Sequence, residues 1–428
     1  MRRLWPRRGR KVSEPPGGHP PQASRRSQRG LDWFAFFVAN LQAGFGPFVS
    51  VYLTSERWTQ TDIGLVLTIG GIASLALQIP GGAVVDASDA KRAVAAWSVL
   101  LVGLSALALA LSPAFPVILA AWLLHAAASC ALTPALAAIS LGLAGHGGMA
   151  RRLGRNASFG SLGNAVAAGL MGIIGYRVSN QAVFIVTALL AVPALAALGR
   201  IRPREIDPHA GETQAESLPS GRRARWRAIL ANRTLYILFG CVMLFHLANA
   251  AMLPMVGSML TLRSKHSPAL LIAACIVVPQ ILVTLLSPMV GALAQSWGRR
   301  PLLLVGFLML PLRGFCFAYI QEEYLFVAVQ LLDGVSAAIL GVLVSLVVAD
   351  ATRKSGHFAL AQGVIGTGMG IGASASTLFA GRIADKFGTG DAFMALATVG
   401  GIAFAAVLLA MPETKYALPR RSRARRRR

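Results

Sequence analysis

The sequence predicts an all-α membrane protein, with twelve transmembrane helices arranged as two pseudo-symmetric six-helix bundles. Only 14% of the 428 residues are charged and 55% are hydrophobic, whereas a soluble domain usually carries about a quarter charged residues. The charges fall between long apolar runs, and about 20 apolar residues suffice to cross ~30 Å of hydrocarbon. Because lipid offers no partner to an unpaired backbone group, these runs are predicted to be helices.

Twelve candidate spans follow one another, and a polar stretch divides six from six. The spans cover residues 31–54, 61–84, 93–111, 114–143, 157–178, 181–199, 234–260, 268–293, 301–320, 324–349, 360–381 and 392–411. The dividing stretch mixes arginine with acidic residues and prolines, which is typical of a linker, and residues 222–230 could form a surface amphipathic helix. The predicted domains are a disordered basic tail (1–30), a first bundle (31–199), a cytoplasmic linker (200–233), a second bundle (234–411) and a basic tail (412–428).

The net charge of +24 indicates membrane topology. Lysine and arginine concentrate in the two tails and the even-numbered loops, whereas the odd-numbered loops hold only Arg57, Arg177, Arg263, Lys265, Arg382 and Lys386. This asymmetry predicts that both termini are cytoplasmic. No nucleic-acid partner is expected, while the basic tails, 420–428 above all, are expected to contact anionic lipid headgroups. The first 30 residues lack the pattern of a signal peptide.

Two similar loops lie one half-protein apart. The first reads Gly82-Ala-Val-Val-Asp86-Ala-Ser-Asp89-Ala-Lys91-Arg92, and the second reads Gly291-Ala-Leu-Ala-Gln295-Ser-Trp-Gly298-Arg299-Arg300. Each has a glycine near a helix end, then a polar residue, then a basic pair. The chain thereby resembles the major facilitator superfamily, whose signature loop recurs between helices two and three and, more weakly, between eight and nine. The resemblance implies a bacterial-type 12-helix transporter in which small-faced helices five and eleven pack against eight and two.

The resemblance also implies that Asp86 latches the cytoplasmic side. A carboxylate there can pair with a basic residue or with the positive N-terminal end of a neighbouring helix. The candidate basic partners are Arg151, Arg152 and Arg155 in the loop after the fourth span. Because Gln295 replaces the acid in the second copy, a weaker second latch is expected. The alternative is that Asp86 is only a solvated helix end.

Two charges lie inside predicted spans, where a lone charge is costly. Arg313 in the ninth span and Asp333 in the tenth are at similar depth, since a helix rises 1.5 Å per residue. They can form a structural ion pair, or Asp333 can belong to a proton or substrate site. Both alternatives stay open from the sequence.

Polar and aromatic side chains mark a candidate cavity, because spans one, four, seven and ten line the cavity in the resembled family. His125 and Ser129 overlie a family pattern of arginine, three residues and glycine found mainly in proton-driven antiporters. His125 and His246 can exchange protons near neutral pH, or each can be a neutral core residue. The other members of this candidate site are Asn249, Asn40, Gln42, Phe45 and Gln330. The segment from Gly44 to Pro47 should kink the first span.

These features favour a proton-coupled secondary transporter of a small organic solute, with efflux or uptake undecided. Amides and aromatics suit a neutral, zwitterionic or amphipathic solute, since an anion site would prefer clustered arginine or lysine. The fifth span lacks the glycine-proline motif of many drug antiporters. The alternative function is a non-transporting membrane receptor or assembly factor on the same fold.

ATP-driven transport is not expected, since the sequence shows no Walker loop. Catalysis is not expected either, since no cluster of His, Cys and Glu has catalytic spacing. The four cysteines (Cys130, Cys241, Cys275 and Cys316) have no metal-ligand spacing. We therefore expect no metal and no cofactor, with a proton gradient as the energy source. The expected form is a functional monomer in the bacterial cytoplasmic (inner) membrane.

Overall fold

A computed structural model describes residues 23–45, 47–207, 210, 231–263, 268–353, 355 and 357–415. Within these ranges the chain folds into helices joined by short connections, and none of these residues forms a strand. The predicted amphipathic helix over 222–230 and the lipid-binding tail over 420–428 lie outside the described residues.

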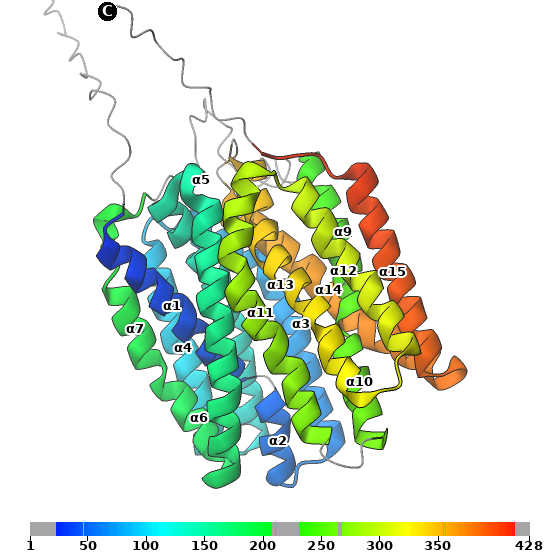
Figure 1. Ribbon diagram of the computed structural model, residues 1–428. Helices are drawn as coiled ribbons and strands as arrows, with labels where there is room; N and C mark the ends of the chain where they lie inside the picture. The colour runs from blue at the N-terminus through cyan, green and yellow to red at the C-terminus, as the bar shows by residue number, and fades with distance from the viewer. Residues whose placement is uncertain are drawn as a thin grey trace, which may run out of the picture.

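The first half of the molecule is a bundle around its own apolar core (Figure 1). Its helices are α1 (Arg25–Ala43), α2 (Pro47–Ser55), α3 (Gln60–Ala87), α4 (Lys91–Leu111), α5 (Phe115–Arg177), α6 (Asn180–Leu189) and α7 (Ala191–Gly199), followed by the 3-10 turn η1 (Pro203–Glu205). The predicted kink in the first span is confirmed, because α1 ends at Ala43 and α2 begins at Pro47.

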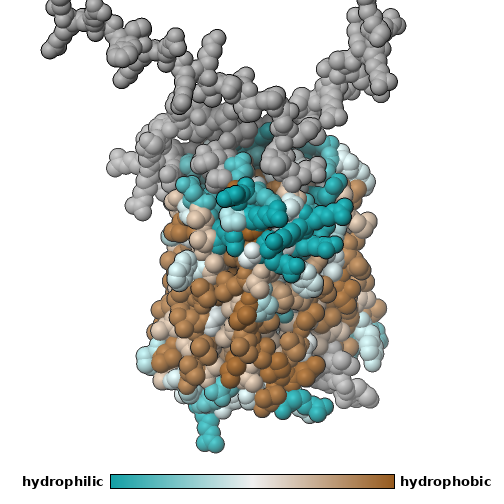
Figure 2. Space-filling model, turned by 90° about the vertical axis from the view of Figure 1, so that its left-hand side faces the viewer, coloured by the Kyte–Doolittle hydropathy of each residue, from teal (hydrophilic) through white to brown (hydrophobic). Residues whose placement is uncertain are grey.

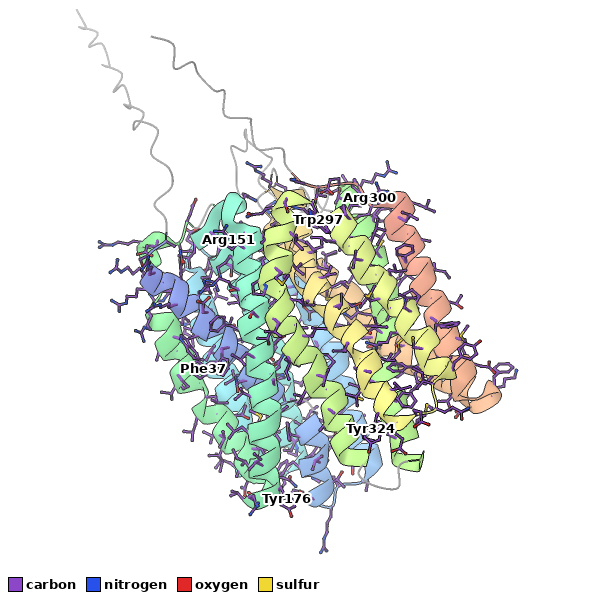
Figure 3. All side chains as sticks on the ribbon, viewed as in Figure 1. Phe37, Arg151, Tyr176, Trp297, Arg300 and Tyr324 are labelled. Carbon is purple, nitrogen blue, oxygen red and sulfur yellow. The ribbon has the colours of Figure 1, made fainter. Side chains whose placement is uncertain are left out.

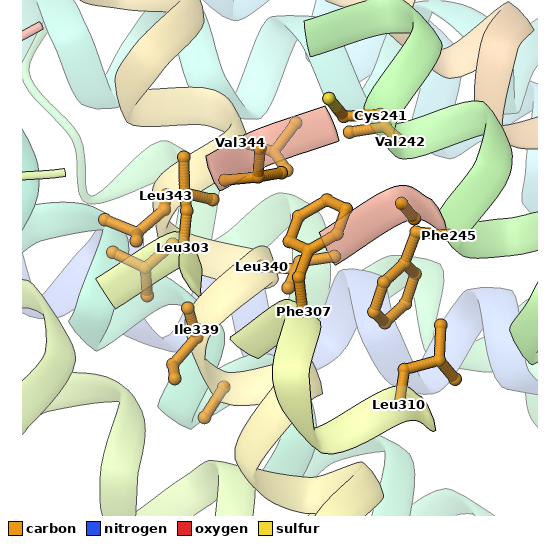
Figure 4. Packing of buried hydrophobic residues seen from close by; sticks show 14 of the residues in the cluster. Cys241, Val242, Phe245, Leu303, Phe307, Leu310, Ile339, Leu340, Leu343 and Val344 are labelled. Carbon is orange, nitrogen blue, oxygen red and sulfur yellow. The ribbon is translucent and has the colours of Figure 1, made fainter. Parts of the chain in front are cut away.

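The second half forms another bundle around a second cluster of buried side chains, in which Phe245, Phe307 and Leu340 interdigitate (Figure 4) and to which Ala150 and Leu153 of the first half also belong. Its helices are α9 (Arg233–Asn249), α10 (Met252–Arg263), α11 (Pro268–Ser296), α12 (Arg300–Tyr319), α13 (Glu323–Thr352), α14 (Phe358–Phe387) and α15 (Thr389–Ala410).

Helix α5 differs from the prediction, because it runs through two expected spans and the loop between them. A straight helix of its 63 residues would be about 95 Å long, roughly three times the hydrocarbon thickness. The helix is instead two helices that meet at Gly145, where φ is 60° and ψ is 174°. That positive φ suits glycine because it lacks a Cβ atom. The described residues hold 11 stretches apolar and long enough to cross a membrane, with this pair counted once.

Two segments next to predicted domain boundaries are also packed into the fold. The disordered tail was placed over 1–30, but α1 already begins at Arg25, capped by the Ser24 hydroxyl, which accepts the Ser27 N–H. The start of the linker is packed, since Ile201 is fully buried and the Asp207 N–H donates to the Gly142 carbonyl at 3.1 Å. The Ser24 hydroxyl caps the first helix, and burial of Ile201 and Ile206 packs the start of the linker against the bundle.

The halves meet where α5 lies against α11 and α3 lies against α14 (Figure 1), as the resemblance implied. Small residues allow this approach. A Cβ atom on Gly363 would overlap the Gln78 carbonyl, and one on Gly154 would lie 2.5 Å from the Ser287 carbonyl oxygen. Close helix contact through glycine is a recurring device of membrane bundles.

The surface is banded as a membrane protein requires. Figure 2 shows a broad belt of apolar side chains with polar side chains above and below it. Exposed residues of this belt include Leu162, Val166, Leu170, Ile173 and Leu189. Exposed apolar area of this extent is explained by lipid contact.

Candidate functional site

Asp86 links the two halves at the end of α3. Its carboxylate accepts two N–H groups at the start of α14, from Ala359 at 2.9 Å and from Leu360 at 2.7 Å. The first N–H groups of a helix have no partner within the helix and carry its positive dipole end, so a carboxylate binds there favourably. Gly82, one turn earlier, leaves room for the Ala359 carbonyl. The helix N-terminus, one of the two predicted kinds of partner, therefore binds Asp86.

The second signature loop repeats this contact with weaker chemistry. A Cβ atom on Gly291 would overlap the Ala150 carbonyl of α5, which mirrors Gly82 against Ala359. Ala150 and Ala359 are as far apart in the sequence as Gly82 and Gly291, so the two contacts occupy corresponding positions in the two halves. Gln295 donates its amide to the Gly147 carbonyl at 3.0 Å. This neutral bond replaces the two charge-assisted bonds that Asp86 accepts.

The arginines proposed as partners of Asp86 bind another carboxylate. Arg152 and Arg155 both pair with Asp32 on α1, whose side chain is only 3% exposed. Arg152 also donates to Asn156 at 2.9 Å, and Asn156 donates to Ser140 at 2.6 Å. This network holds α1 against both parts of α5. The assignment of Arg152 and Arg155 to Asp86 was wrong, and Asp32 was missed because it lies at the predicted end of a span.

Basic residues after the signature glycines hold the loops in place. Lys91 donates to the Val85 carbonyl at 2.8 Å, and Arg299 donates to the Ala294 carbonyl at 2.8 Å. Each thereby satisfies a carbonyl near the last turn of α3 or α11. Arg299 also pairs with Asp350 of α13 at 2.8 Å.

Glu413 anchors the segment after α15 to the second loop. Its carboxylate accepts the N–H groups of Arg299 at 2.9 Å and Arg300 at 3.1 Å. Burial raises the pKa of the Glu413 carboxyl, but these bonds and one from the Lys415 N–H outweigh burial and hold the pKa below its ordinary value. Gly298, with φ 107°, lies against this carboxylate. Figure 3 places Arg151, Trp297 and Arg300 at one end of the molecule and Tyr176 toward the other.

Inside the second bundle, Arg313 of α12 pairs with Asp333 of α13, as their predicted depth allowed. The Arg313 side chain is 3% exposed and that of Asp333 is 27% exposed. Arg313 also lies near the Met252 sulfur, at 3.3 Å, and its guanidinium carbon is 5.7 Å from the Phe317 ring centre. The arginine is thus enclosed, while the carboxylate is partly accessible.

Inside the first bundle, His125 stacks on Phe45 with 3.8 Å between ring centres and an interplanar angle of 13°. The Trp122 ring lies near both, with its centre 5.7 Å from that of His125 and 6.2 Å from that of Phe45. The Ser129 hydroxyl donates to the Gln42 amide oxygen at 3.1 Å and lies 3.4 Å from His125 Nε2. His125 Nδ1 is buried and makes no hydrogen bond to the described residues. This cluster joins four predicted site residues with Trp122, which the sequence reasoning missed.

The remaining predicted site residues are placed separately. His246 bonds to the Val242 carbonyl of its own helix at 3.0 Å, and Asn40 donates to the Phe36 carbonyl at 3.0 Å. The amide oxygens of Asn249 and Gln330 are buried without a hydrogen-bond partner among the described residues. Unpaired buried amide oxygens are costly. Arg92 is half-buried and Arg151 is exposed.

Metal ligation has no support in the part of the chain that the structure describes, where no group of three or more His, Cys, Asp or Glu side chains is close enough to hold an ion. The four cysteines are all free thiols, and three of them are buried.

Comparison with known proteins identifies the family. The model of the Major Facilitator Superfamily matches residues 33–283 and 238–427. Two uncharacterised MFS-type transporters, from the CDC 1551/Oshkosh and H37Rv strains of Mycobacterium tuberculosis, are each 41% identical to this chain over 392 residues, which is 91% of this chain and 94% of each relative.

Solved structures share the fold at low sequence identity. The Escherichia coli fucose:proton symporter superposes with a TM-score of 0.70 at 13% identity, covering 90% of this chain and 97% of the symporter. A nucleoside transporter, NupG, superposes with a TM-score of 0.63 at 15% identity, covering 90% of this chain and 100% of that one. From its signature loops, its two bundles and these matches, we conclude that the chain is an integral membrane transporter of the major facilitator superfamily.

Proposed function

We propose that this transporter couples the movement of a small organic solute to the movement of protons, by alternating access between the two sides of the membrane. The observation that carries the proposal is the ion pair of Arg313 and Asp333 inside the second bundle. A charge at that depth is costly, so its retention favours a functional role. Protonation of Asp333 would remove the charge that compensates Arg313, which couples proton binding to the packing of α12 and α13.

The cluster around His125 supports the solute class. Aromatic rings of Phe45, Trp122 and His125 offer stacking surfaces, and Gln42 with Ser129 offers neutral hydrogen-bonding groups. An uncharged cluster of this kind suits a neutral, zwitterionic or amphipathic molecule, because a carboxylate or phosphate would need a cationic partner. The buried and unpaired Nδ1 of His125 is a group that a solute hydroxyl or amide could satisfy.

The proposed mechanism uses the latch at α3 and α14. Asp86 bound to the start of α14 and Gln295 bound to Gly147 hold the halves together at the end that carries the basic loops. The positive-inside pattern assigns this end to the cytoplasm. Transport would require these contacts to open, so that solute bound between the halves reaches that side.

The test is proton flux in liposomes that contain the purified protein. A panel of neutral, zwitterionic and amphipathic solutes is added across an imposed pH gradient, and internal pH is followed with a trapped dye. We expect at least one solute to change the internal pH, with the sign giving symport or antiport.

The control variant neutralises both partners, Asp333→Asn with Arg313→Gln, because removing one partner alone leaves a buried charge uncompensated. It should still bind the solute but lose solute-dependent proton movement. Solute flux that leaves internal pH unchanged would rule out proton coupling. Proton movement that survives in the double variant would remove Asp333 from the mechanism.

A further inference from the structure

Two rows of side chains run side by side on the outer face of the first bundle. On α1, Arg25, Arg29, Trp33 and Phe37 follow one another at intervals of one helical turn, and on α5, Arg151, Arg155 and Phe159 do the same. Residues spaced by four lie on one face of a helix. In both rows the arginines come first and the aromatic rings follow toward the apolar belt.

The two rows are fixed against each other by direct contacts. The rings of Trp33 and Phe159 meet edge to face, with 5.9 Å between centres, and Trp33 also contacts Phe37 at 6.0 Å. Beneath them, the buried Asp32 binds Arg152 and Arg155. The start of α1 is held by Ser24, whose N–H and hydroxyl both donate to Glu205 at 2.9 Å.

The arginines of this seam carry more charge than the protein neutralises. Arg25, Arg29 and Arg151 are exposed and form no ion pair with any described residue. The nearby carboxylates are already used, since Asp32 is 3% exposed beneath Arg152 and Arg155, and Glu205 pairs with Arg202. The seam therefore has unsatisfied affinity for an anion.

The seam also lies at the depth of lipid headgroups. Figure 2 shows polar side chains directly above the apolar belt, and Figure 3 places Arg151 toward the polar end of the molecule and Phe37 below it. Trp33 is 47% exposed, and exposed tryptophan is enriched at the level where headgroups meet hydrocarbon. Arginine presents several N–H donors in a fixed geometry that matches phosphate oxygens.

We propose that the α1/α5 seam, formed by Arg25, Arg29, Arg151, Trp33, Phe37 and Phe159, is a binding site for one anionic phospholipid. The three arginines hold the phosphate and the anionic headgroup. Trp33, Phe37 and Phe159 contact the glycerol region and the first methylene groups of an acyl chain. The site lies beside the moving interface, because Ser158, next to Phe159, donates to the Thr284 carbonyl of α11 at 2.7 Å.

The experiment uses tryptophan quenching by brominated lipid. The full-length protein is reconstituted in phosphatidylcholine vesicles in which a rising fraction is either brominated phosphatidylglycerol or brominated phosphatidylcholine. We expect the phosphatidylglycerol to quench at a lower mole fraction, and Trp33→Phe to remove that excess quenching. Because each basic residue near the surface attracts anionic lipid, the triple variant Arg25→Gln, Arg29→Gln, Arg151→Gln should lower the preference for phosphatidylglycerol by about a hundredfold.

A matched variant tests whether the site is specific. Arg177→Gln, Arg382→Gln and Lys386→Gln remove the same charge from exposed residues outside the seam, in the predicted outer loops. This variant should keep the preference. Equal losses in the two triple variants would overturn the proposal, since the attraction would then follow net charge alone. Equal quenching by both lipids, or excess quenching that survives in Trp33→Phe, would overturn it as well. The Trp33→Phe result does not depend on the folding of either triple variant.

Discussion

Each of three buried arginines has a carboxylate partner in its own half of the molecule. Arg152 binds Asp32, Arg299 binds Asp350, and Arg313 binds Asp333. Burying a charge is affordable only when it is paired and hydrogen-bonded. Two of these pairs lie at the ends of spans, where they fix neighbouring helices. The pair of Arg313 and Asp333 lies within the bundle, and only its carboxylate is partly exposed.

Reversal of that pair separates structure from function. Asp333→Asn alone should lower the free energy of unfolding by about 3–5 kcal/mol, because it leaves Arg313 buried and unpaired. The swap Arg313→Asp with Asp333→Arg should recover most of the thermal stability but not solute-driven proton flux. The measurements are the melting temperature in detergent and the liposome pH assay. A swap that also restores transport would show that the pair is only structural.

At the scale of the element, the N-terminus of α14 supplies one of the two kinds of partner that were predicted for Asp86. Its first N–H groups bind Asp86, and the glycine one turn before Asp86 lets the two helices approach. The corresponding start of the second helix in α5 meets Gly291 and Gln295. The contact between α3 and α14 therefore depends on a charge, and the contact between α5 and α11 does not.

Neutralising Asp86 should weaken the latch without unfolding the protein. Asp86→Asn removes a carboxylate at a helix N-terminus, which is worth about 1 kcal/mol, so we expect an unchanged melting temperature within a few degrees and a transport rate reduced several-fold. Asp89→Asn is the matched control, because Asp89 is exposed in the same loop. Transport by Asp86→Asn at the level of this control would refute the latch.

At the scale of the whole molecule, the halves touch mainly through two helix pairs, α5 with α11 and α3 with α14, and α5 also contacts α13 and α14. Each half has its own main cluster of buried side chains, although α5 contributes residues to both clusters. Among the described residues, hydrogen bonds at Asp86, Gln295 and Ser158 join the two halves. An interface of small residues and few bonds can open without unfolding either half.

Cross-linking tests this rigid-body motion. In a variant whose four native cysteines are replaced by serine or alanine, Ser158→Cys with Thr284→Cys places two thiols across α5 and α11. We expect a short bifunctional thiol reagent to join them and abolish transport, since α5 and α11 can then no longer separate. If the reagent contains a cleavable disulfide, adding a reductant should restore transport. The reagent should not change transport by either single-cysteine variant. Full transport by the cross-linked protein would contradict alternating access by separation of α5 from α11.

The sequence by itself determined the class of the protein, because hydrophobic span length, charge asymmetry and the two signature loops are properties of contiguous residues. It also placed Arg313 and Asp333 at similar depth, since depth along two adjacent spans follows from helical rise, and so offered their pairing as one of two alternatives. Only the tertiary structure decided which carboxylate the arginines after the fourth span would bind, and that Asp86 would bind α14. Those partners are far apart in sequence, and their meeting depends on how α1, α5, α3 and α14 pack. The sequence predicted a loop between the fourth and fifth spans, whereas the structure continues the helix on both sides of Gly145 and confines the break to the positive φ of that residue.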